Sequence, residues 1–266
     1  MSAAKIAFCF LTYSNLERSR IWRRYIEPNM DRCSVYVHPK LPLSDPFFRQ
    51  FTLKKCTPTY RKSDIFIVYA TILLITEALK DERNKKIVFL SQSCLPIVSF
   101  NDLYFSIIND NKSHIKSFNN NRKDRFHQLS TNFKKHIGYH RFTKQHPNMI
   151  LDRSHAEIFT NLNLLNHFKR MECPDEHYFV NILKVLNKDI ENHQICFCNF
   201  YTNRTQGINH QTLSEKLMRD LRQKGYFFIR KINRGCRICG NYFNILNESN
   251  DSANLSKHST PLFPLK

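Results

Sequence analysis

Short runs of apolar residues alternate with amphipathic stretches along the first third of the chain. Continuous apolar runs at residues 5–13, 33–38 and 86–90 are typical of strands buried in a parallel sheet. Between these runs, residues 16–26 and 65–80 have the length and the apolar spacing of helices. A strand–helix–strand order of this kind predicts an α/β domain with right-handed crossover connections.

The rest of the chain follows the same pattern less regularly. The other expected elements are a short strand at 51–55, helices at 101–109, 156–168 and 212–224, and strands at 195–200 and 226–229. Residues 110–135 are polar and basic, which predicts either a loop over a site or a solvated surface, and we favour the surface. A Ser- and Asn-rich tail at 247–266 is expected to be disordered, so residues 1–246 form the single predicted domain.

Residues 172–186 read ECPDEHYFVNILKVL and predict one helix that begins near Pro174. Its buried stripe is expected to consist of Phe179, Ile182, Leu183 and Leu186. Asp175 and Glu176 then lie in the first turn, where the helix dipole favours negative charge. A carboxylate fixed there has the properties of a general base, although acids at helix starts also occur for stability alone.

The composition indicates a folded, strongly basic chain. It has 266 residues, 41% of them hydrophobic, and a net charge of +19. The charge suggests an anionic partner such as nucleic acid, phosphate, acidic lipid or acidic glycan, but a solvated basic surface explains it equally well. No basic zipper, RNP-like motif or complete zinc finger is present, and with 5 glycines there is no Gly-rich phosphate loop.

No signal peptide or membrane anchor is visible in the sequence. The longest apolar run, residues 65–79, is too short for a comfortable span and carries Tyr, Thr and Glu. We therefore expect a soluble protein, cytoplasmic in location.

The nine cysteines are an odd number and several lie inside apolar strands, so we expect mostly reduced thiols. A zinc site is the alternative, with the ligands Cys196, Cys198, Cys236 and Cys239. Unpaired core thiols are the interpretation we favour, because a C-x-C beside a C-x-x-C is not a standard ligand spacing.

Polar residues follow three of the predicted strands. Thr12, His38 and Ser91–Cys94 come at the carboxyl ends of these strands, where ligands bind in open α/β sheets. We expect Thr12, His38, Ser91 and Ser93 to border one nucleotide crevice. His38 also fits a structural role at the strand end, which we favour.

Four segments in fixed order together resemble a known family. KIAFCFLTY…SVYVHP, KKIVFLSQSCLPI, PDEHYFVNIL and YFFIRKI, from about residue 5 to residue 232, are similar to the core-2/I-branching N-acetylglucosaminyltransferases and their plant relatives. The resemblance implies a GT-A-like nucleotide-sugar-binding α/β fold, with a mostly parallel central sheet flanked by helices. It also implies inverting transfer of a sugar, GlcNAc or xylose, from a UDP-sugar to an acceptor hydroxyl.

The family lacks the Asp-x-Asp motif and works without a divalent metal, and here Ser91–Leu95 stands in that place with no acid. Family members usually carry a Golgi membrane anchor. We expect a UDP-sugar and a glycan or other hydroxyl acceptor as partners, with no cofactor and no nucleic acid.

By the same resemblance, Glu176 takes the position of the general base. Lys231 and Arg204 fall where the family binds the UDP diphosphate, and Arg230 is an alternative for either cation. A base removes the acceptor proton, while fixed cations stabilise the leaving diphosphate as a metal does elsewhere. The rival hypothesis is a catalytically degenerate basic protein that binds nucleic acid or an acidic glycan; it gives no reason for keeping both PDEH and FIRKI.

Overall fold

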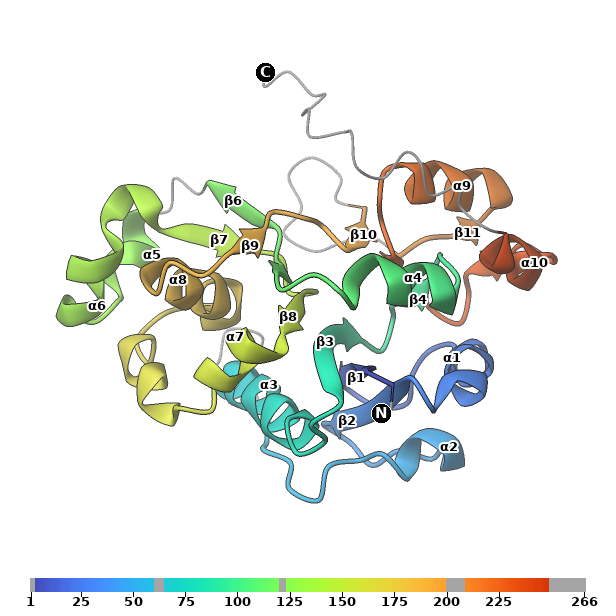
Figure 1. Ribbon diagram of the computed structural model, residues 1–266, viewed down its shortest axis with the longest axis horizontal. Helices are drawn as coiled ribbons and strands as arrows, with labels where there is room; N and C mark the ends of the chain where they lie inside the picture. Colours follow the sequence, from blue (N-terminus) through green and yellow to red (C-terminus); the bar gives the residue numbers. More distant parts are fainter. Residues whose placement is uncertain (1–2, 60–64, 120–122, 200–208, 249–266) are drawn as a thin grey trace.

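A six-stranded sheet forms the centre of the computed structural model, which describes residues 3–59, 65–119, 123–199 and 209–248 (Figure 1). Its strand order is β2-β1-β3-β8-β5-β9. These strands are β1 (Lys5–Thr12), β2 (Cys33–Pro39), β3 (Asn84–Ser91), β5 (Ser113–His114), β8 (Ile150–Asp152) and β9 (Ile190–Glu191). The pairs β1–β2, β1–β3 and β5–β9 are parallel, and β8 is antiparallel to both of its neighbours. The predicted α/β class with a mostly parallel central sheet is confirmed.

One face of the sheet packs against α1 (Ser19–Ile26). Alternate side chains of β1, among them Phe8 and Phe10, point to this face and meet Trp22 edge-on, with ring centroids 5.9 and 4.9 Å apart. Trp22 is fully buried and its indole Nε1 donates to the Cys94 carbonyl at 2.8 Å. This aromatic cluster fixes α1 against the end of β3.

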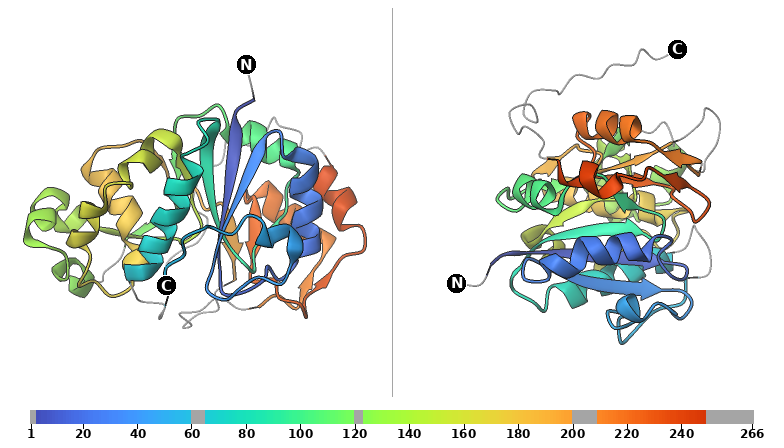
Figure 2. Two further views of the ribbon diagram at one scale, coloured as in Figure 1. Left: turned by 90° about the horizontal axis from the view of Figure 1, so that it is seen from below. Right: turned by 90° about the vertical axis from the view of Figure 1, so that its right-hand side faces the viewer.

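The opposite face packs against α3 (Ile65–Ala78) and α8 (Tyr178–Val185), so that helices lie on both sides of the sheet (Figure 2). Ala7 and Cys9 of β1 point to this side and are fully buried. Because both faces are covered, residues 6–11 of the strand are all apolar, which is why the sequence shows continuous runs instead of alternation.

A second sheet has the order β10-β12-β4. Its strands are β10 (Cys196–Cys198), β12 (Phe228–Arg230) and β4 (Leu95–Pro96). The central strand, β12, is parallel to β10 and antiparallel to β4. Just beyond β12, the backbone N–H of Ile232 donates to the Ser93 carbonyl at 2.9 Å. This sheet therefore brings the predicted basic segment near residue 231 to the loop that follows β3.

The remaining elements are short. The helices are α2 (Pro46–Arg49), α4 (Phe100–Ile107), α5 (Lys123–His127), α6 (Thr131–Ile137), α7 (Arg153–Ile158), α9 (Glu215–Gln223) and α10 (Tyr242–Asn247). The strands are β6 (Ser117–Asn119), β7 (Thr143–Gln145), β11 (Thr212–Leu213) and β13 (Arg237–Ile238). Short 3-10 turns are η1 (Glu27–Asn29), η2 (Tyr139–Arg141), η3 (Leu162–His167) and η4 (Pro174–Glu176).

Several expected elements differ from the structure, among them the helix predicted at 212–224, whose first two residues form β11 and which begins at Glu215. The segment 110–135, predicted as loop or surface, includes β5, β6, α5 and α6. The strand predicted at 51–55 is reduced to an isolated bridge between Val37 and Thr52. The helix predicted at 156–168 ends at Ile158 and resumes as η3, because the Asn161 side chain accepts from the Asn163 N–H and starts a new turn.

Within the described ranges, no helix combines the length and the apolarity needed to cross a membrane. Most of the tail predicted at 247–266 lies outside the described residues, so the domain boundary at 246 stays a prediction.

Candidate active site

The segment around Glu176 is not the single helix that its sequence predicts. The chain forms η4, breaks at His177 with a φ of −135°, and only then enters α8. The break follows from a tertiary contact, because the buried His177 ring stacks on Phe142 and its Nδ1 lies 3.0 Å from the Thr143 carbonyl. Glu176 therefore lies outside α8, and the prediction that places it in the first turn of that helix is wrong.

The apolar stripe of α8 is correct for three of its four members. Phe179, Ile182 and Leu183 are buried, whereas Leu186 is 46% exposed because α8 ends one residue earlier.

Glu176 forms an ion pair with Lys144 of β7, with 2.8 Å between Oε2 and Nζ. Both side chains are about one-third exposed, at 33% and 39%, so the carboxylate is accessible to a ligand. The neighbouring Asp175 is in a different environment: its Oδ1 is buried and has no hydrogen-bond partner. Burial, followed by the nearby Glu176 charge, raises the pKa of Asp175 to about 7. The two adjacent acids therefore differ: Glu176 faces solvent, whereas Asp175 keeps its proton up to about neutral pH.

Arg230 ends β12 and lies in a partly buried position. Its Nη1 donates to the Asn148 side-chain oxygen at 3.2 Å, while its Nε is buried without a partner. Within the part of the chain that is described, Arg230 makes no ion pair with a carboxylate. A guanidinium held in this way keeps its charge available for an anionic ligand.

Lys231 follows directly, and its carbonyl accepts from the His210 N–H at 2.9 Å. The His210 ring binds the Arg230 carbonyl, so the backbone of both cations is fixed by one histidine. Arg204, the third predicted cation, lies outside the described residues.

One short segment, residues 144–148, contacts both the acid Glu176 and the cation Arg230. Lys144 pairs with Glu176, and Asn148, four residues later, binds Arg230. His146 lies between them, and burial together with the Arg230 charge lowers its pKa to about 4, so its ring is neutral. Sequence reasoning missed this segment; the polar run KQHPN before β8 was its only signal.

The loop that holds Ser91 and Ser93 contacts the chain just after Lys231, and the nucleotide crevice that these serines are expected to border stays a prediction. Their hydroxyl oxygens are 3.4 Å apart, and the Ser91 hydroxyl is 3.3 Å from the Cys94 sulfur. The carbonyl of Ser93 accepts from Ile232, which follows Lys231.

Thr12 and His38 are buried at the ends of β1 and β2. The Thr12 hydroxyl has no partner, which leaves one polar atom at the end of the sheet unsatisfied. His38 is fully enclosed and its Nε2 accepts from the Thr57 N–H at 3.0 Å. That contact matches the structural role favoured for His38, and contact of Thr12 or His38 with a ligand stays a prediction.

The cysteines of the proposed zinc site belong to different sheets. Cys196 and Cys198 lie in β10, whereas Cys236 and Cys239 flank β13. No group of three or more His, Cys, Asp and Glu side chains in the described ranges is arranged to hold a metal ion. None of the nine cysteines, each of which lies in the described part of the chain, forms a disulfide.

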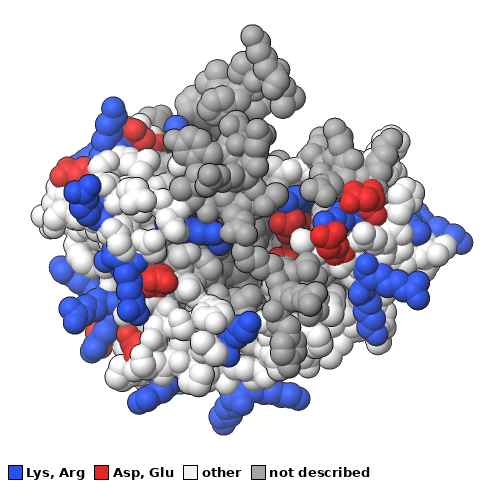
Figure 3. Space-filling view, turned by 180° about the vertical axis from the view of Figure 1, so that it is seen from behind, with Lys and Arg blue, Asp and Glu red and all other residues white. Residues whose placement is uncertain are grey.

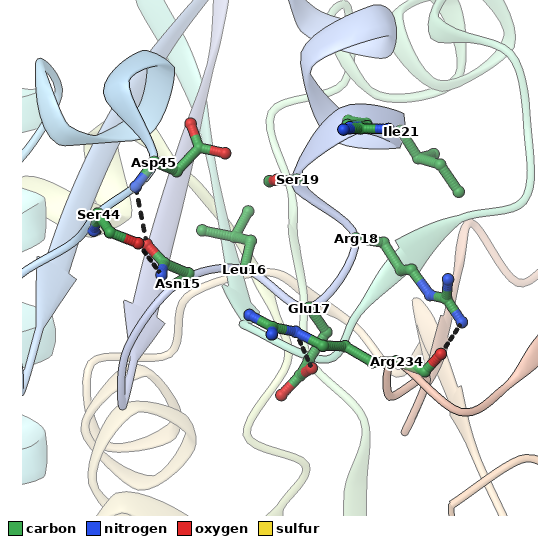
Figure 4. Close-up of a pocket in the computed structure, with 10 residues that line it drawn as sticks. Asn15, Leu16, Glu17, Arg18, Ser19, Ile21, Ser44, Asp45 and Arg234 are labelled. Atoms are coloured by element: carbon green, nitrogen blue, oxygen red, sulfur yellow. Dashed lines mark hydrogen bonds and ion pairs between the residues drawn. The ribbon is translucent and has the colours of Figure 1, made fainter.

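A cavity of about 580 Å³ opens beside the start of α1 (Figure 4). It is lined by residues 15–21, Ser44, Asp45 and Arg234. Arg18 crosses its edge and donates to the carbonyls of Asn233 and Arg234. None of the predicted site residues lines this cavity, so it neighbours the loop after Lys231 without including the Glu176 turn.

Known proteins give two sequence matches. The sequence model of the Core-2/I-Branching enzyme family matches residues 6–218. Glycosyltransferase BC10 of rice, Oryza sativa subsp. japonica, is 26% identical over 162 residues. That alignment covers 58% of this chain and 40% of the rice protein, so the chain spans well under half of the relative's length.

Two solved structures show a distant likeness, each with a TM-score of 0.37. The galactosyltransferase LgtC is 11% identical, with 67% of this chain and 70% of that one covered. Mouse xyloside xylosyltransferase 1 is 12% identical, with 74% and 88% covered. The family match, which spans most of the chain, settles the relationship: this protein belongs to the Core-2/I-branching enzyme family.

Proposed function

We propose that this chain is a glycosyltransferase with a GT-A-like nucleotide-sugar site. It moves a sugar, GlcNAc or xylose, from a UDP-sugar to an acceptor hydroxyl, with inversion and without a divalent metal. Family membership supports the reaction class. The observation that carries the assignment of residues is the segment 144–148, which contacts both the acid Glu176 and the cation Arg230.

Glu176 acts as the general base. In an inverting transfer, the acceptor oxygen bonds to the anomeric carbon as the bond from that carbon to UDP breaks, and the base takes the acceptor proton. Glu176 is accessible, and Lys144 holds its carboxylate in place at 2.8 Å. Asp175 is less suited to the role because its buried carboxyl retains a proton to about neutral pH.

The leaving diphosphate is stabilised by positive charge. Arg230 and Lys231 are consecutive, and Arg204 joins them by the family resemblance. Fixed cations that face developing negative charge lower the barrier in the way a bound metal does. The Ser91–Leu95 loop beside them contains no acid, in keeping with a site that holds no metal.

Substitution of the base tests the proposal most simply. Glu176→Gln should lower transfer by about 10²–10⁴-fold while UDP binding is retained, because the amide cannot accept the proton. Glu172→Gln, an exposed acid four residues earlier, is the matched control and should keep full activity. A fully active Glu176→Gln enzyme, measured with UDP-GlcNAc and UDP-xylose in EDTA, would remove Glu176 from the mechanism.

The rival hypothesis of a basic binding protein draws less support from the surface. Figure 3 shows one face of the molecule. Among the described residues on that face, Lys and Arg are scattered between Asp and Glu and do not form a single basic patch. Binding of RNA or DNA that falls steeply with salt, together with absence of UDP binding, would favour that rival.

A further inference from the structure

The Cys94 sulfur lies among hydrogen-bond donors. The thiol is 1% exposed, at the end of the loop between β3 and β4. The Ser91 backbone N–H donates to it at 3.4 Å and the Asn148 amide nitrogen at 3.6 Å. The Ser91 hydroxyl, at 3.3 Å, can donate as well. These donors place the sulfur as a hydrogen-bond acceptor. An ionised sulfur accepts stronger hydrogen bonds than a neutral thiol does.

Positive charge reaches the same sulfur from β12. That strand runs antiparallel to β4 with Ile229 opposite Leu95, and this register brings Arg230 beside Cys94. Burial alone would raise the pKa of Cys94, but a hydrogen bond from Cys196 and the charge of Arg230 bring it down to about 6.

The other titratable groups near Cys94 do not oppose its ionisation. Burial raises the pKa of Cys196 and Cys198, so both remain neutral thiols. His146, whose pKa is near 4, is also uncharged. Arg230 is thus the charged neighbour of the Cys94 sulfur in the described structure.

Asn148 connects this sulfur to the proposed donor site. It is buried, and its amide nitrogen donates to the Cys94 sulfur and to the Phe89 carbonyl, the latter at 3.1 Å. With both amide hydrogens taken, the side-chain oxygen faces Arg230 and accepts from Nη1 at 3.2 Å. The orientation of one amide therefore decides whether Arg230 finds an acceptor or a donor.

We propose that Cys94 is a thiolate in the folded protein and that, through Asn148, it positions Arg230 of the donor site. An ionised sulfur can only accept, so together with the Phe89 carbonyl it fixes which way the Asn148 amide points. Asn148 and Cys94 are positioning residues in this scheme, and Arg230 makes the contact with the ligand. The identity of that ligand, a nucleoside diphosphate, rests on the proposed function.

Absorbance at 240 nm tests the thiolate without any nucleotide. Cys94 is the one thiol whose pKa is lowered; the pKa of each of the other eight is raised. Between pH 5 and 8 the protein should gain the absorbance of one thiolate. Cys94→Ser should abolish this gain, and Cys33→Ser, at a buried thiol in the same core, should preserve it. A gain that survives Cys94→Ser, or its absence in the unaltered protein, would overturn the proposal.

The link through Asn148 is tested by a double-mutant cycle. Asn148→Ala should weaken UDP binding about ten-fold, since it removes one hydrogen bond to a charged group. In an Arg230→Ala background the same change should weaken binding no further. An equal loss in both backgrounds would show that Asn148 does not act through Arg230 and would overturn the link.

The two tests separate this proposal from the proposed function. Asn148→Ala and Arg230→Ala should each move the 240 nm titration of Cys94 to higher pH, because each removes stabilisation of the thiolate. Both variants leave Cys94 in place, so this readout holds even if Cys94→Ser does not fold. Shifted titrations in a protein that binds no UDP would reject the nucleotide site alone; unshifted titrations would reject the link.

Discussion

Lys86 is the side chain whose removal should affect the fold most clearly. It lies in β3 with no exposed surface, and its ammonium contacts Asp110, Asp152 and the Lys112 carbonyl, the last two at 3.2 and 2.9 Å. These contacts tie β3 to β8 and to the turn before β5. Lys86→Met keeps most of the aliphatic chain and removes only the charge, so it isolates the ionic contribution.

The magnitude follows from how far the two acids are buried. Removal of one partner of a buried ion pair costs about 3–5 kcal/mol. Asp110 and Asp152 keep 31% and 12% of their side-chain surface exposed, so water can partly replace the lysine. We therefore expect a loss of about 3 kcal/mol, at the lower end of that range.

Urea unfolding measures this loss as a shift of the midpoint by about 1 M, for an m-value of ~3 kcal/mol/M. Lys85→Met, at the exposed neighbouring position of the same strand, is the control and should change stability by less than about 0.5 kcal/mol. Addition of Asp110→Asn and Asp152→Asn to Lys86→Met should recover part of the loss. Equal stability of the Lys86 and Lys85 variants would refute the buried ion cluster.

The same cluster sets a dependence on pH. Burial would raise the pKa of Asp110 and Asp152, but hydrogen bonds from Lys86, and from Ser154 to Asp152, lower both pKa values below the usual range. Their contribution to stability is therefore present above the ordinary carboxyl pKa of about 3.9 and is lost as pH falls through the lower folded-state pKa. In Lys86→Met, burial is no longer offset by the ammonium and the folded-state pKa of both carboxyls rises, so the fall in stability with acid should become smaller or reverse.

Two further variants test local features. Asp175 has a raised folded-state pKa, so its contribution is fully present below the ordinary carboxyl pKa and is lost as pH rises through about 7. Thermal melts of Asp175→Asn should therefore show a gain over the unaltered protein that is larger at pH 8 than at pH 5, and equal gains would contradict this burial. His38→Ala should lose about 3 kcal/mol by urea unfolding, from the cavity and the unpaired Thr57 N–H. Its UDP affinity should stay unchanged, and a large loss of affinity in a stable variant would place His38 in the site.

The central strands could be predicted because their signal is local. Strand β1 is apolar at residues 6–11 because helices cover both faces, and that pattern is visible in the sequence alone. The break at His177 could not be predicted, because its cause is a contact with Phe142 and the Thr143 carbonyl, more than thirty residues away. Local helical spacing gave no sign of that contact.

In the candidate site, too, the residues with a local sequence signal could be predicted and those that act through long-range contacts could not. Glu176, Lys231 and Arg230 could be named from the family resemblance, but Lys144 and Asn148 could not. Both matter only through long-range contacts, Lys144 with Glu176 and Asn148 with Arg230. Likewise, the polar segment 110–135 carries ordered strands because Lys86 and its acids fix the turn before β5.

Isothermal titration with UDP in the presence of EDTA tests the nucleotide site most directly. The account predicts micromolar binding that survives EDTA and is lost in Lys231→Ala, while Lys216→Ala, at an exposed lysine of α9, binds as the unaltered protein does. Absence of binding by folded protein, or binding that Lys231→Ala leaves intact, would contradict a donor site built on this basic segment.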